Sequence, residues 1–378
     1  MTLFRGDMIK RILPMVFSIG VILLSASLQA QEPPAQVLKQ SFGAGEGYQD
    51  GELASARFFR PQGMCGIGGS VFYIADTFNH CLRKLNVQNN EVKTVLGRCT
   101  EKGREEASNV AREAIRLDTP ADIACLPKME YVYLLDSGNN RIIKLNSATA
   151  EELVLHFNQG EVGGERLSRP LGLALDPKGD ALYVADTGNH RVLRVDLKTA
   201  AVERMAGTGF PGFELKGKTA QDLSLNEPTD VFPLHNSSGF ALLFVADSRN
   251  GVIRKIEPGD RSPWIMSLFA GGDHIGLLQE PPGPAQLIRL DRPYRLGFFD
   301  GPTMQILYVG LPTQAQVTAF SLTRHSSVVI EGERLDKAPL RPQALYVDSY
   351  GDLWLFDQTS TLRHYWVKPE NTATPASN

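Results

Sequence analysis

Short, uniformly apolar segments separated by turn residues recur along the whole chain. The segments "LGLAL" (171–175), "ALYVA" (181–185) and "ALLFVA" (241–246) carry apolar side chains at consecutive positions instead of alternating with polar ones. This pattern is typical of strands that are buried on both faces. The chain also has 35 Gly and 23 Pro, which favour many turns over long helices. We therefore expect an all-β protein.

The second of these segments continues into "YVADTGNHRVLRV" (183–195), which belongs to an internal repeat. Clear copies begin at Tyr73, Tyr133, Tyr183 and Phe244, and degenerate copies begin at Tyr308 and Leu353. Each copy follows a proline, and these prolines are Pro61, Pro120, Pro170, Pro228, Pro293 and Pro342. Several copies are followed by an apolar strand that ends in glycine, at Gly97, Gly207, Gly271 and Gly332. A unit of roughly fifty residues with four strands is typical of one propeller blade.

The sixth unit contains only three predicted strands before the polar end of the chain. The segment "QVLKQSFGAG", residues 36–45, precedes the first unit and has the same strand-then-glycine ending. Pairing this segment with the last unit would remove both exposed sheet edges. The sequence therefore predicts a six-bladed β-propeller over residues 31–367, with four-stranded blades and a closing strand at the N-terminal end.

The repeat resembles the NHL repeat, whose signature is an apolar strand followed by D-x-x-N-H and a strand with Arg or Lys. Residues 183–195 fit this pattern best, whereas Leu311 and Gln314 replace Asp and Asn in the fifth unit. The resemblance implies a propeller. Since NHL proteins include enzymes, RNA binders, sensor domains and protein-binding modules, it does not decide the function.

The two ends of the chain differ from the repeats. Residues 1–30 combine Arg5, Lys10 and Arg11 with an apolar run and a small-residue site at Ala30, as a secretory signal peptide does. Residues 368–378 are polar and predict a flexible tail. We expect a periplasmic or secreted protein with no stable membrane insertion after cleavage. A net charge of −3 and the absence of a long Lys/Arg run argue against nucleic-acid binding.

The cysteines support the same compartment. None of the four forms a C-x-x-C pair, so zinc or thioredoxin-type chemistry is disfavoured. In an oxidising compartment they predict two disulfides with three possible connectivities. The predicted fold favours Cys81 with Cys99 and Cys65 with Cys125, because the first pair lies at one end of a hairpin and the second lies on adjacent innermost strands.

The Asp and Asn of the D-x-x-N turns are expected to be structural, because one active site does not need four copies. Asp would accept hydrogen bonds from turn N–H groups and Asn would tolerate a positive φ angle. The following His80 and His190 are expected to be exposed. The four pairs are Asp76 and Asn79, Asp136 and Asn139, Asp186 and Asn189, and Asp247 and Asn250.

Charged residues are also expected in the central channel. The residues two places after each proline should face it, and they are Gly63, Asp122, Gly172, Asp230, Arg295 and Ala344. One interpretation is an Asp230–Arg295 ion pair beside a backbone-bonded Asp122. The other is a site for Ca²⁺ or another divalent cation, as a metal-dependent lactonase or lyase would need.

Zinc chemistry of the NHL-like amidating lyases is disfavoured. The resemblance implies that a zinc-binding His would directly follow a blade-opening proline. The residues there are Gln62, Ala121, Leu171, Thr229, Tyr294 and Gln343.

Candidate binding residues lie where the repeats differ. Arg60, Arg169, Arg292 and Arg341 precede four of the prolines and could form an electropositive rim, although solvated ion pairs would explain them too. In the long connections, Phe210, Phe213 and His274 could contact a ligand or simply fill blade junctions.

We expect a non-catalytic scaffold that binds a protein or small ligand through its loop-rich face and needs no cofactor. The alternative is a hydrolase or lyase of the six-bladed type with a channel metal of unknown identity.

Overall fold

The computed structural model describes residues 36–104, 115–127, 129–146, 152–155, 166–215, 219–235, 241–259, 264–272, 284–302, 305–322, 327–331 and 341–367. The predicted signal peptide, the predicted tail and His274 lie outside these ranges. No helix in the described ranges is long and apolar enough to cross a membrane.

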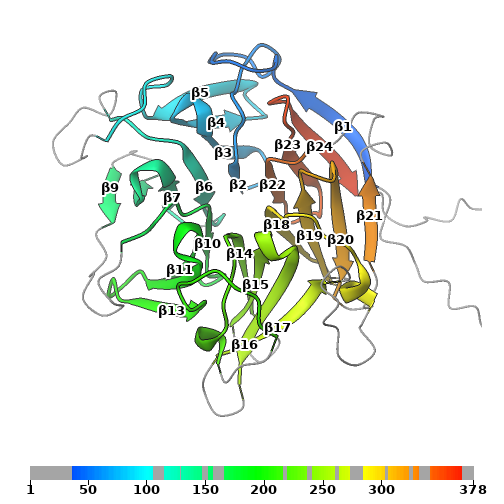
Figure 1. The fold of residues 1–378 in the computed structure, drawn as a ribbon. Helices are drawn as coiled ribbons and strands as arrows, with labels where there is room; N and C mark the ends of the chain where they lie inside the picture. The colour runs from blue at the N-terminus through cyan, green and yellow to red at the C-terminus, as the bar shows by residue number, and fades with distance from the viewer. Residues whose placement is uncertain are drawn as a thin grey trace, which may run out of the picture. The chain divides into compact units, whose positions relative to one another are not determined.

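Six antiparallel four-stranded sheets form the six blades of a propeller, as predicted (Figure 1). In each blade the first strand is innermost and consecutive strands pair outwards. Blade one contains β2 (Gly63–Ile67), β3 (Val71–Asp76), β4 (Cys81–Asn86) and β5 (Glu91–Leu96). Blade two contains β6 (Pro120–Ala124), β7 (Tyr131–Asp136), β8 (Arg141–Asn146) and β9 (Glu152–Leu155). Blade three contains β10 (Gly172–Leu175), β11 (Ala181–Asp186), β12 (Arg191–Asp196) and β13 (Val202–Ala206).

The second half of the ring follows the same plan. Blade four contains β14 (Pro228–His235), β15 (Ala241–Asp247), β16 (Val252–Pro258) and β17 (Trp264–Gly271). Blade five contains β18 (Arg295–Asp300), β19 (Gln305–Leu311), β20 (Gln316–Ser321) and β21 (Ser327–Glu331). Blade six contains β22 (Ala344–Val347), β23 (Leu353–Phe356) and β24 (Leu362–Val367).

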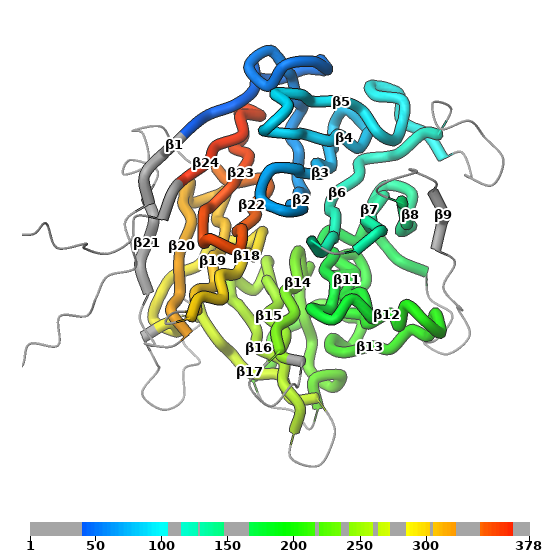
Figure 2. The backbone as a smooth tube through the Cα atoms, turned by 180° about the vertical axis from the view of Figure 1, so that it is seen from behind, coloured from blue at the N-terminus to red at the C-terminus, as the bar shows by residue number. Residues whose placement is uncertain are grey.

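Blade six is completed by β1 (Gln36–Phe42), which pairs antiparallel with β24 on its outer edge (Figure 2). The register places Phe42 opposite Leu362 and Gln36 opposite Val367. The predicted closure of the ring by the N-terminal segment is confirmed. It covers an edge that would otherwise present unpaired backbone groups.

The hydrophobic core lies between neighbouring blades, which explains the uniformly apolar strands. In β3, Phe72 and Ile74 pack towards blade six, whereas Tyr73 and Ala75 pack towards blade two. Successive side chains of a strand point to opposite faces, so both sets are buried only when a blade is covered on both sides. An equivalent cluster fills each of the other junctions.

Chain direction defines two faces of the propeller. The innermost strands all begin at one face, and because the second strand runs back, the D-x-x-N turns lie there too. We call it the D-x-x-N face. The first-to-second-strand turns, such as residues 176–180, lie at the other end of the blades, which we call the reverse face.

Both predicted disulfides are present. Cys65 and Cys125 join β2 to the end of β6, with Cα atoms 5.9 Å apart. Cys81 and Cys99 join the start of β4 to the segment after β5, with Cα atoms 5.0 Å apart. The first disulfide therefore crosses a blade junction beside the channel, and the second closes the outer part of blade one.

Candidate functional site

The D-x-x-N turns are the centres of a repeated polar network, shown most clearly in blade three. The Asp186 Oδ1 atom accepts a hydrogen bond from the backbone N–H of Ser168, 2.8 Å away, two residues before the proline. Its Oδ2 atom accepts from Asn189 Nδ2 at 2.9 Å and from Arg191 Nε at 2.8 Å. Burial raises the pKa of Asp186, and these donors oppose that rise. The turn thus ties the incoming chain to the second and third strands.

Blades one, two and four repeat this arrangement. The aspartates accept backbone N–H groups of Phe59, Asp118 and Asn226 at 2.7–2.8 Å, and each also meets its own Asn and an Arg. In blade two this Arg is Arg141, which begins the third strand as Arg191 does in blade three. Blades one and four have Cys81 and Val252 there, and Arg83 and Arg254 reach the carboxylate from two residues further along the same face. Burial raises the pKa of these three aspartates as well.

Two details of the predicted turn were wrong. The aspartate side chain does not cap its own turn; it accepts from the segment before the proline. The asparagine lies in a short 3-10 turn, and the next residue takes the left-handed conformation, with φ of 55° at His80 and 49° at His190. The sequence pattern placed the positive φ one residue too early.

His80 and His190 are half-buried and connect adjacent blades, contrary to the expectation of exposed turn residues. The Nδ1 atom of His80 accepts the backbone N–H of Thr119 at 3.0 Å, and His190 accepts that of Glu227 at 3.0 Å. Asn140 serves blade two in the same way, through Arg169 N–H at 2.6 Å. The side chain of the residue after the turn therefore accepts a backbone N–H group from the segment that leads into the next blade.

Blade five keeps its turn although Asp and Asn are replaced. The Gln314 Oε1 atom accepts the backbone N–H of Asp291 at 2.8 Å, two residues before Pro293. Its Nε2 group donates to the carbonyl of Arg289 at 3.3 Å. One glutamine side chain therefore accepts the backbone N–H that Asp accepts in blades one to four, and donates to a backbone carbonyl as Asn does there.

Arg295 crosses the channel on the side of the D-x-x-N face and plugs it. Its guanidinium is 3% exposed. It donates to the carbonyl oxygens of the residues that follow the first four blade prolines, which are Gln62 at 2.7 Å, Ala121 at 2.8 Å, Leu171 at 2.8 Å and Thr229 at 3.4 Å. A single side chain from blade five therefore binds blades one to four.

The expected ion pair has a different acidic partner. Arg295 Nη1 lies 3.4 Å from Asp122 Oδ2, on blade two, and the predicted pairing with Asp230 is wrong. The reason is reach: the long side chain extends past its neighbouring blade to the carbonyl oxygens opposite. The expectation that Asp122 is bonded to the backbone holds, because it accepts the N–H groups of Ile123 and Leu173, both at 2.9 Å.

Among the described residues, Asp230 forms hydrogen bonds with backbone groups alone. Its oxygens accept the N–H groups of Val231 and Leu296, both at 2.8 Å, so it links blades four and five as Asp122 links blades two and three. Burial, followed by the negative charge of Asp122, raises the pKa of Asp230 to about 7. Burial also raises the pKa of Asp122, and the Arg295 charge opposes that rise.

Gly63 and Gly172 allow the backbone of the next blade to approach closely at Asp122 and Asp230. A Cβ atom on Gly63 would lie 2.4 Å from Asp122 Cα, and one on Gly172 would lie 2.6 Å from Asp230 Cα. Glycine and aspartate thus alternate around four blades because the backbones approach closely there.

Below the plug, the channel contains a cavity of about 210 Å³. Its lining includes Asp122, Asp230 and Arg295 at one end and contains residues of all six innermost strands. Leu126 and Pro127, which come after β6, also line it. The cavity therefore extends towards the reverse face, and the channel residues predicted from the sequence line only its charged end.

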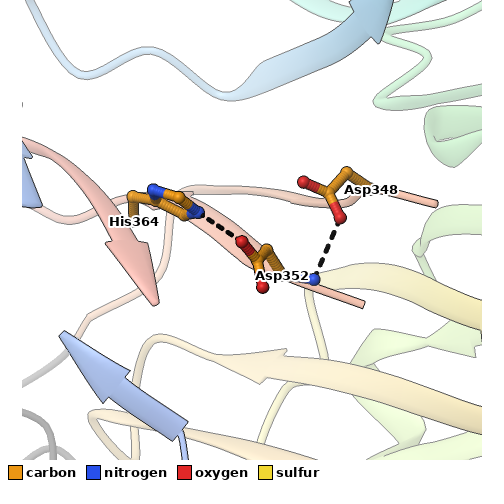
Figure 3. A group of neighbouring side chains, drawn as sticks. All are labelled: Asp348, Asp352 and His364. Carbon is orange, nitrogen blue, oxygen red and sulfur yellow. Dashed lines mark hydrogen bonds and ion pairs between the residues drawn. The ribbon is translucent and has the colours of Figure 1, made fainter. Parts of the chain in front are cut away.

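Within the described ranges, one group of three His, Cys, Asp or Glu side chains lies close enough together to hold a metal ion. It consists of Asp348, Asp352 and His364 in blade six, with one candidate ligand atom from each within 4.8 Å of the others (Figure 3). This set was not predicted from the sequence. Its signal is the turn "DSYGD" at 348–352, which corresponds to "DPKGD" at 176–180 in blade three.

The hydrogen bonds of these three side chains stabilise the turn at 348–352 and join it to the neighbouring strands. Asp348 accepts the N–H groups of Tyr350 at 2.9 Å and Asp352 at 3.0 Å and the Trp354 indole N–H at 3.1 Å. His364 Nε2 lies 2.8 Å from Asp352 Oδ2, and its ring stacks on Trp354 at 3.7 Å. These contacts hold the last blade together.

The rim arginines are exposed on the D-x-x-N face. Arg60, Arg169 and Arg292 have positive φ angles of 47°, 42° and 50°, which few non-glycine residues adopt. Arg341 is exposed as well. Among the four, only Arg60 has a carboxylate within ion-pair distance in the described part of the chain, namely Glu46 at 3.2 Å.

The two predicted aromatic contact residues differ in exposure. Phe210 is 75% exposed in the connection between blades three and four. Phe213, in the same connection, is half-buried, and the buried Arg254 guanidinium lies 4.4 Å from its ring centroid. Phe213 thus covers a blade junction, and Phe210 is free to contact a partner.

A small hollow of about 110 Å³ lies on the D-x-x-N face where blades four and five meet. Its lining includes Arg249, Arg289 and Arg292 together with Asp291. Arg249 is paired with Glu227 at 3.0 Å. In the described ranges Arg289 and Arg292 have no carboxylate within ion-pair distance, so the hollow is electropositive.

Comparisons with known proteins agree with this fold. The model of the NHL repeat matches residues 167–194. The chain is 34% identical over 98 residues to Protein SUPPRESSOR OF QUENCHING 1, chloroplastic, of Arabidopsis thaliana; the match covers 26% of this chain and 9% of that protein. The chain therefore spans less than a tenth of that relative.

Solved structures match over most of the chain. A protein of unknown function from Bacteroides thetaiotaomicron is similar with a TM-score of 0.63 and 17% identity, covering 88% of this chain and 76% of that one. An auxiliary nutrient binding protein from Bacteroides ovatus is similar with a TM-score of 0.61 and 12% identity, covering 89% and 78%. At these identities the likeness is one of fold.

Proposed function

We propose that this six-bladed propeller, which carries an NHL repeat at residues 167–194, is an exported binding protein that recognises an acidic segment of a partner protein and carries out no reaction of its own. The observation that carries the proposal is the hollow between blades four and five, where Arg289 and Arg292 present guanidinium groups free of carboxylates among the described residues. Arginine binds carboxylates through paired, charge-assisted hydrogen bonds.

The backbone around the hollow supports recognition by a rigid surface. Arg292 is held at φ 50°, and the next residue begins the approach to the innermost strand β18. The Gln314 side chain anchors the preceding residue, Asp291, by its N–H. A preorganised site loses less conformational entropy on binding than a mobile loop does. Phe210, exposed on the same face, would add apolar contact area.

The channel chemistry supports a role without catalysis. Asp122 and Asp230 accept backbone N–H groups of adjacent blades, and the Arg295 guanidinium lies among backbone carbonyl oxygens where a channel cation would have to bind. These contacts favour a structural plug over a lactonase-type metal centre. The structural neighbour from Bacteroides ovatus is described as a nutrient binding protein, which is in keeping with a binding role.

The compartment follows from separate observations. The two disulfides suit an oxidising environment, and the signal-peptide pattern of residues 1–30 would direct export. We therefore propose that the protein acts in the periplasm or outside the cell.

The binding test uses a fluorescently labelled oligoglutamate peptide, with oligolysine as the charge control. The double variant Arg289→Ala, Arg292→Ala should weaken oligoglutamate binding about tenfold or more, because two charge-assisted contacts are lost. The matched control is Lys178→Ala, Lys198→Ala, which removes two exposed charges from the reverse face. Equal loss in both double variants, or no binding of oligoglutamate by the wild type, would refute the proposal.

Catalysis is tested separately. The purified protein should not hydrolyse chromogenic lactones, and its melting temperature should not change when a chelator is added. Two results together would favour the enzymatic alternative instead: the wild type hydrolyses lactones and regains this activity when Ca²⁺ is added after the chelator, and Asp122→Asn abolishes it.

A further inference from the structure

The channel cavity has a closed, charged end and an apolar wall. The Arg295 plug closes it on the side of the D-x-x-N face, where the guanidinium binds carbonyl oxygens of four blades. From there its lining follows the innermost strands to Leu126 and Pro127 at the reverse face. A ligand would therefore enter from the reverse face, opposite the arginine rim.

The wall offers an apolar body many contacts and few hydrogen bonds. It includes Ile123, Leu173, Phe232 and Phe298, with the rings of the two phenylalanines 5.9 Å apart. Among the described lining residues, Tyr346 carries the one hydroxyl, and it donates to the carbonyl of Gly66 at 3.3 Å. Sugars and other polar neutral ligands need many polar partners, so this wall does not suit them.

The charged end carries more acid than base. Asp122 and Asp230 face a single cation, Arg295, and Arg295 pairs with Asp122. In the part of the chain that the structure describes, Asp230 has two backbone N–H donors, one on each oxygen. A carboxylate oxygen can accept a second hydrogen bond, so Asp230 keeps acceptor capacity on a surface of the cavity.

The groups near Asp230 compensate its charge only in part, because the Arg295 charge acts on Asp122 as well. Tyr294, next to the plug, donates its hydroxyl to Gln62 Oε1 at 2.9 Å. Burial and the negative charge of Asp122 raise the pKa of Asp230 to about 7, while the Arg295 charge and the two backbone N–H donors oppose this rise. An anionic ligand would increase the excess negative charge at this end of the cavity, and a cationic ligand would reduce it.

We infer that the cavity is a binding site for a small amphiphilic amine, whose ammonium group pairs with Asp230 and whose apolar body lies against Phe232, Phe298 and Leu173. The size fits such a ligand, because an apolar protein cavity of about 150 Å³ holds benzene and this one has about 210 Å³. This site is separate from the proposed acidic-segment site on the D-x-x-N face, so either can fail without the other.

The test compares two probes of nearly equal shape, benzylamine and benzyl alcohol, in titrations followed by calorimetry at pH 8. The wild type should bind benzylamine about tenfold or more tightly than benzyl alcohol, because only the ammonium forms a charge-assisted bond with Asp230. In Asp230→Asn this preference should vanish. The matched control Asp180→Asn, which removes an exposed carboxylate from the reverse face, should keep it.

A cavity-filling variant tests the apolar part of the site. Ala174, half-buried on the cavity wall, can be replaced in Ala174→Leu, which should weaken the binding of both probes. Circular dichroism and the melting temperature check that each variant is folded. If Ala174→Leu does not fold, the comparison of the two probes on wild type and Asp230→Asn still decides. Equal affinity of the wild type for both probes, no benzylamine binding at millimolar concentration, or a preference that survives in Asp230→Asn would overturn the inference.

Discussion

The Arg295 guanidinium pairs with Asp122 at 3.4 Å, on the far side of the channel from its own blade, and not with Asp230 on the adjacent blade. This pairing makes Arg295 a cross-link between blade five and four other blades. Among the described residues, Asp230 then has backbone N–H donors alone. The stability of the ring and the charge of the cavity therefore depend on one side chain.

Replacing Arg295 should destabilise the propeller strongly. Arg295→Lys keeps the positive charge but cannot reach carbonyl oxygens on several blades at once, since the ammonium is a point donor. Breaking a buried charged network costs about 3–5 kcal/mol. Urea unfolding followed by circular dichroism measures the change, and the exposed Arg292→Lys is the control, expected to stay within about 0.5 kcal/mol of wild type. Similar midpoints for the two variants would contradict the cross-link.

The channel glycines should not tolerate a methyl group. Gly63→Ala and Gly172→Ala each place Cβ against the Cα atom of an aspartate on the next blade, at 2.4 Å and 2.6 Å. Overpacking of this kind costs about 1–3 kcal/mol. Ala344 occupies the equivalent place in blade six and already carries a methyl group, so Ala344→Gly should cost about 1 kcal/mol or less. Thermal melts of the three variants test this order, and an unchanged Gly63→Ala would contradict the close approach.

Acid should weaken the contact between blades one and two through His80. Burial lowers the pKa of His80, and the lowering effect of Lys102 adds to it while Asp118 opposes it. The neutral imidazole is the form that accepts the Thr119 N–H. A histidine with a depressed pKa in the folded state contributes stability above its unfolded pKa of about 6.5, and this contribution is lost as the pH falls below that value.

The variant His80→Asn isolates this effect. Asparagine is the residue that blade two uses for the same contact, at Asn140, and it does not titrate. His80→Asn should therefore match wild type near pH 8 and lose less stability between pH 7 and pH 5, as measured by unfolding at several pH values. Parallel pH profiles for variant and wild type would show that His80 does not titrate with folding.

Asp230 should act in the opposite pH direction. Its pKa of about 7 in the folded protein lies above the unfolded value of about 3.9, so its contribution is fully present below pH 4 and is lost as the pH rises towards 7. In Asp230→Asn this part of the loss should disappear, at about 1.4 kcal/mol for each unit of pKa shift removed. Unfolding free energies at pH 4, 5.5 and 7 give the comparison, with Asp180→Asn as the exposed control. A steeper decline in Asp230→Asn than in wild type would contradict the assignment.

The regular parts of the molecule were predictable because they depend on local pattern and on repetition. The prolines marked the approach to every innermost strand, and the missing strand of the sixth unit identified the closing strand β1. The cysteines could be paired once the blades were known, because Cys65 and Cys125 then fell on adjacent blades. Each of these inferences needed only the order of elements along the chain.

The polar contacts could not be obtained in that way. Gln314 looked like a lost repeat residue, yet its longer side chain makes the contacts of both Asp and Asn. His80 looked like a turn residue, yet it receives an N–H group from the next blade. The set of Asp348, Asp352 and His364 joins a turn to a strand twelve or more residues further along the chain. Side-chain length and backbone curvature decide such contacts, and neither is visible in a one-dimensional pattern.

By itself, the sequence determined six repeated units, their four-stranded form, the closure of the ring and the two disulfides, because burial of both sheet faces leaves a strong periodic signal in residue type. Only the tertiary structure decided which acid Arg295 meets, which face the cavity opens towards, and which arginines surround a hollow. Those outcomes depend on distances across the channel and between blades, where a difference of a few ångströms in side-chain reach changes the partner.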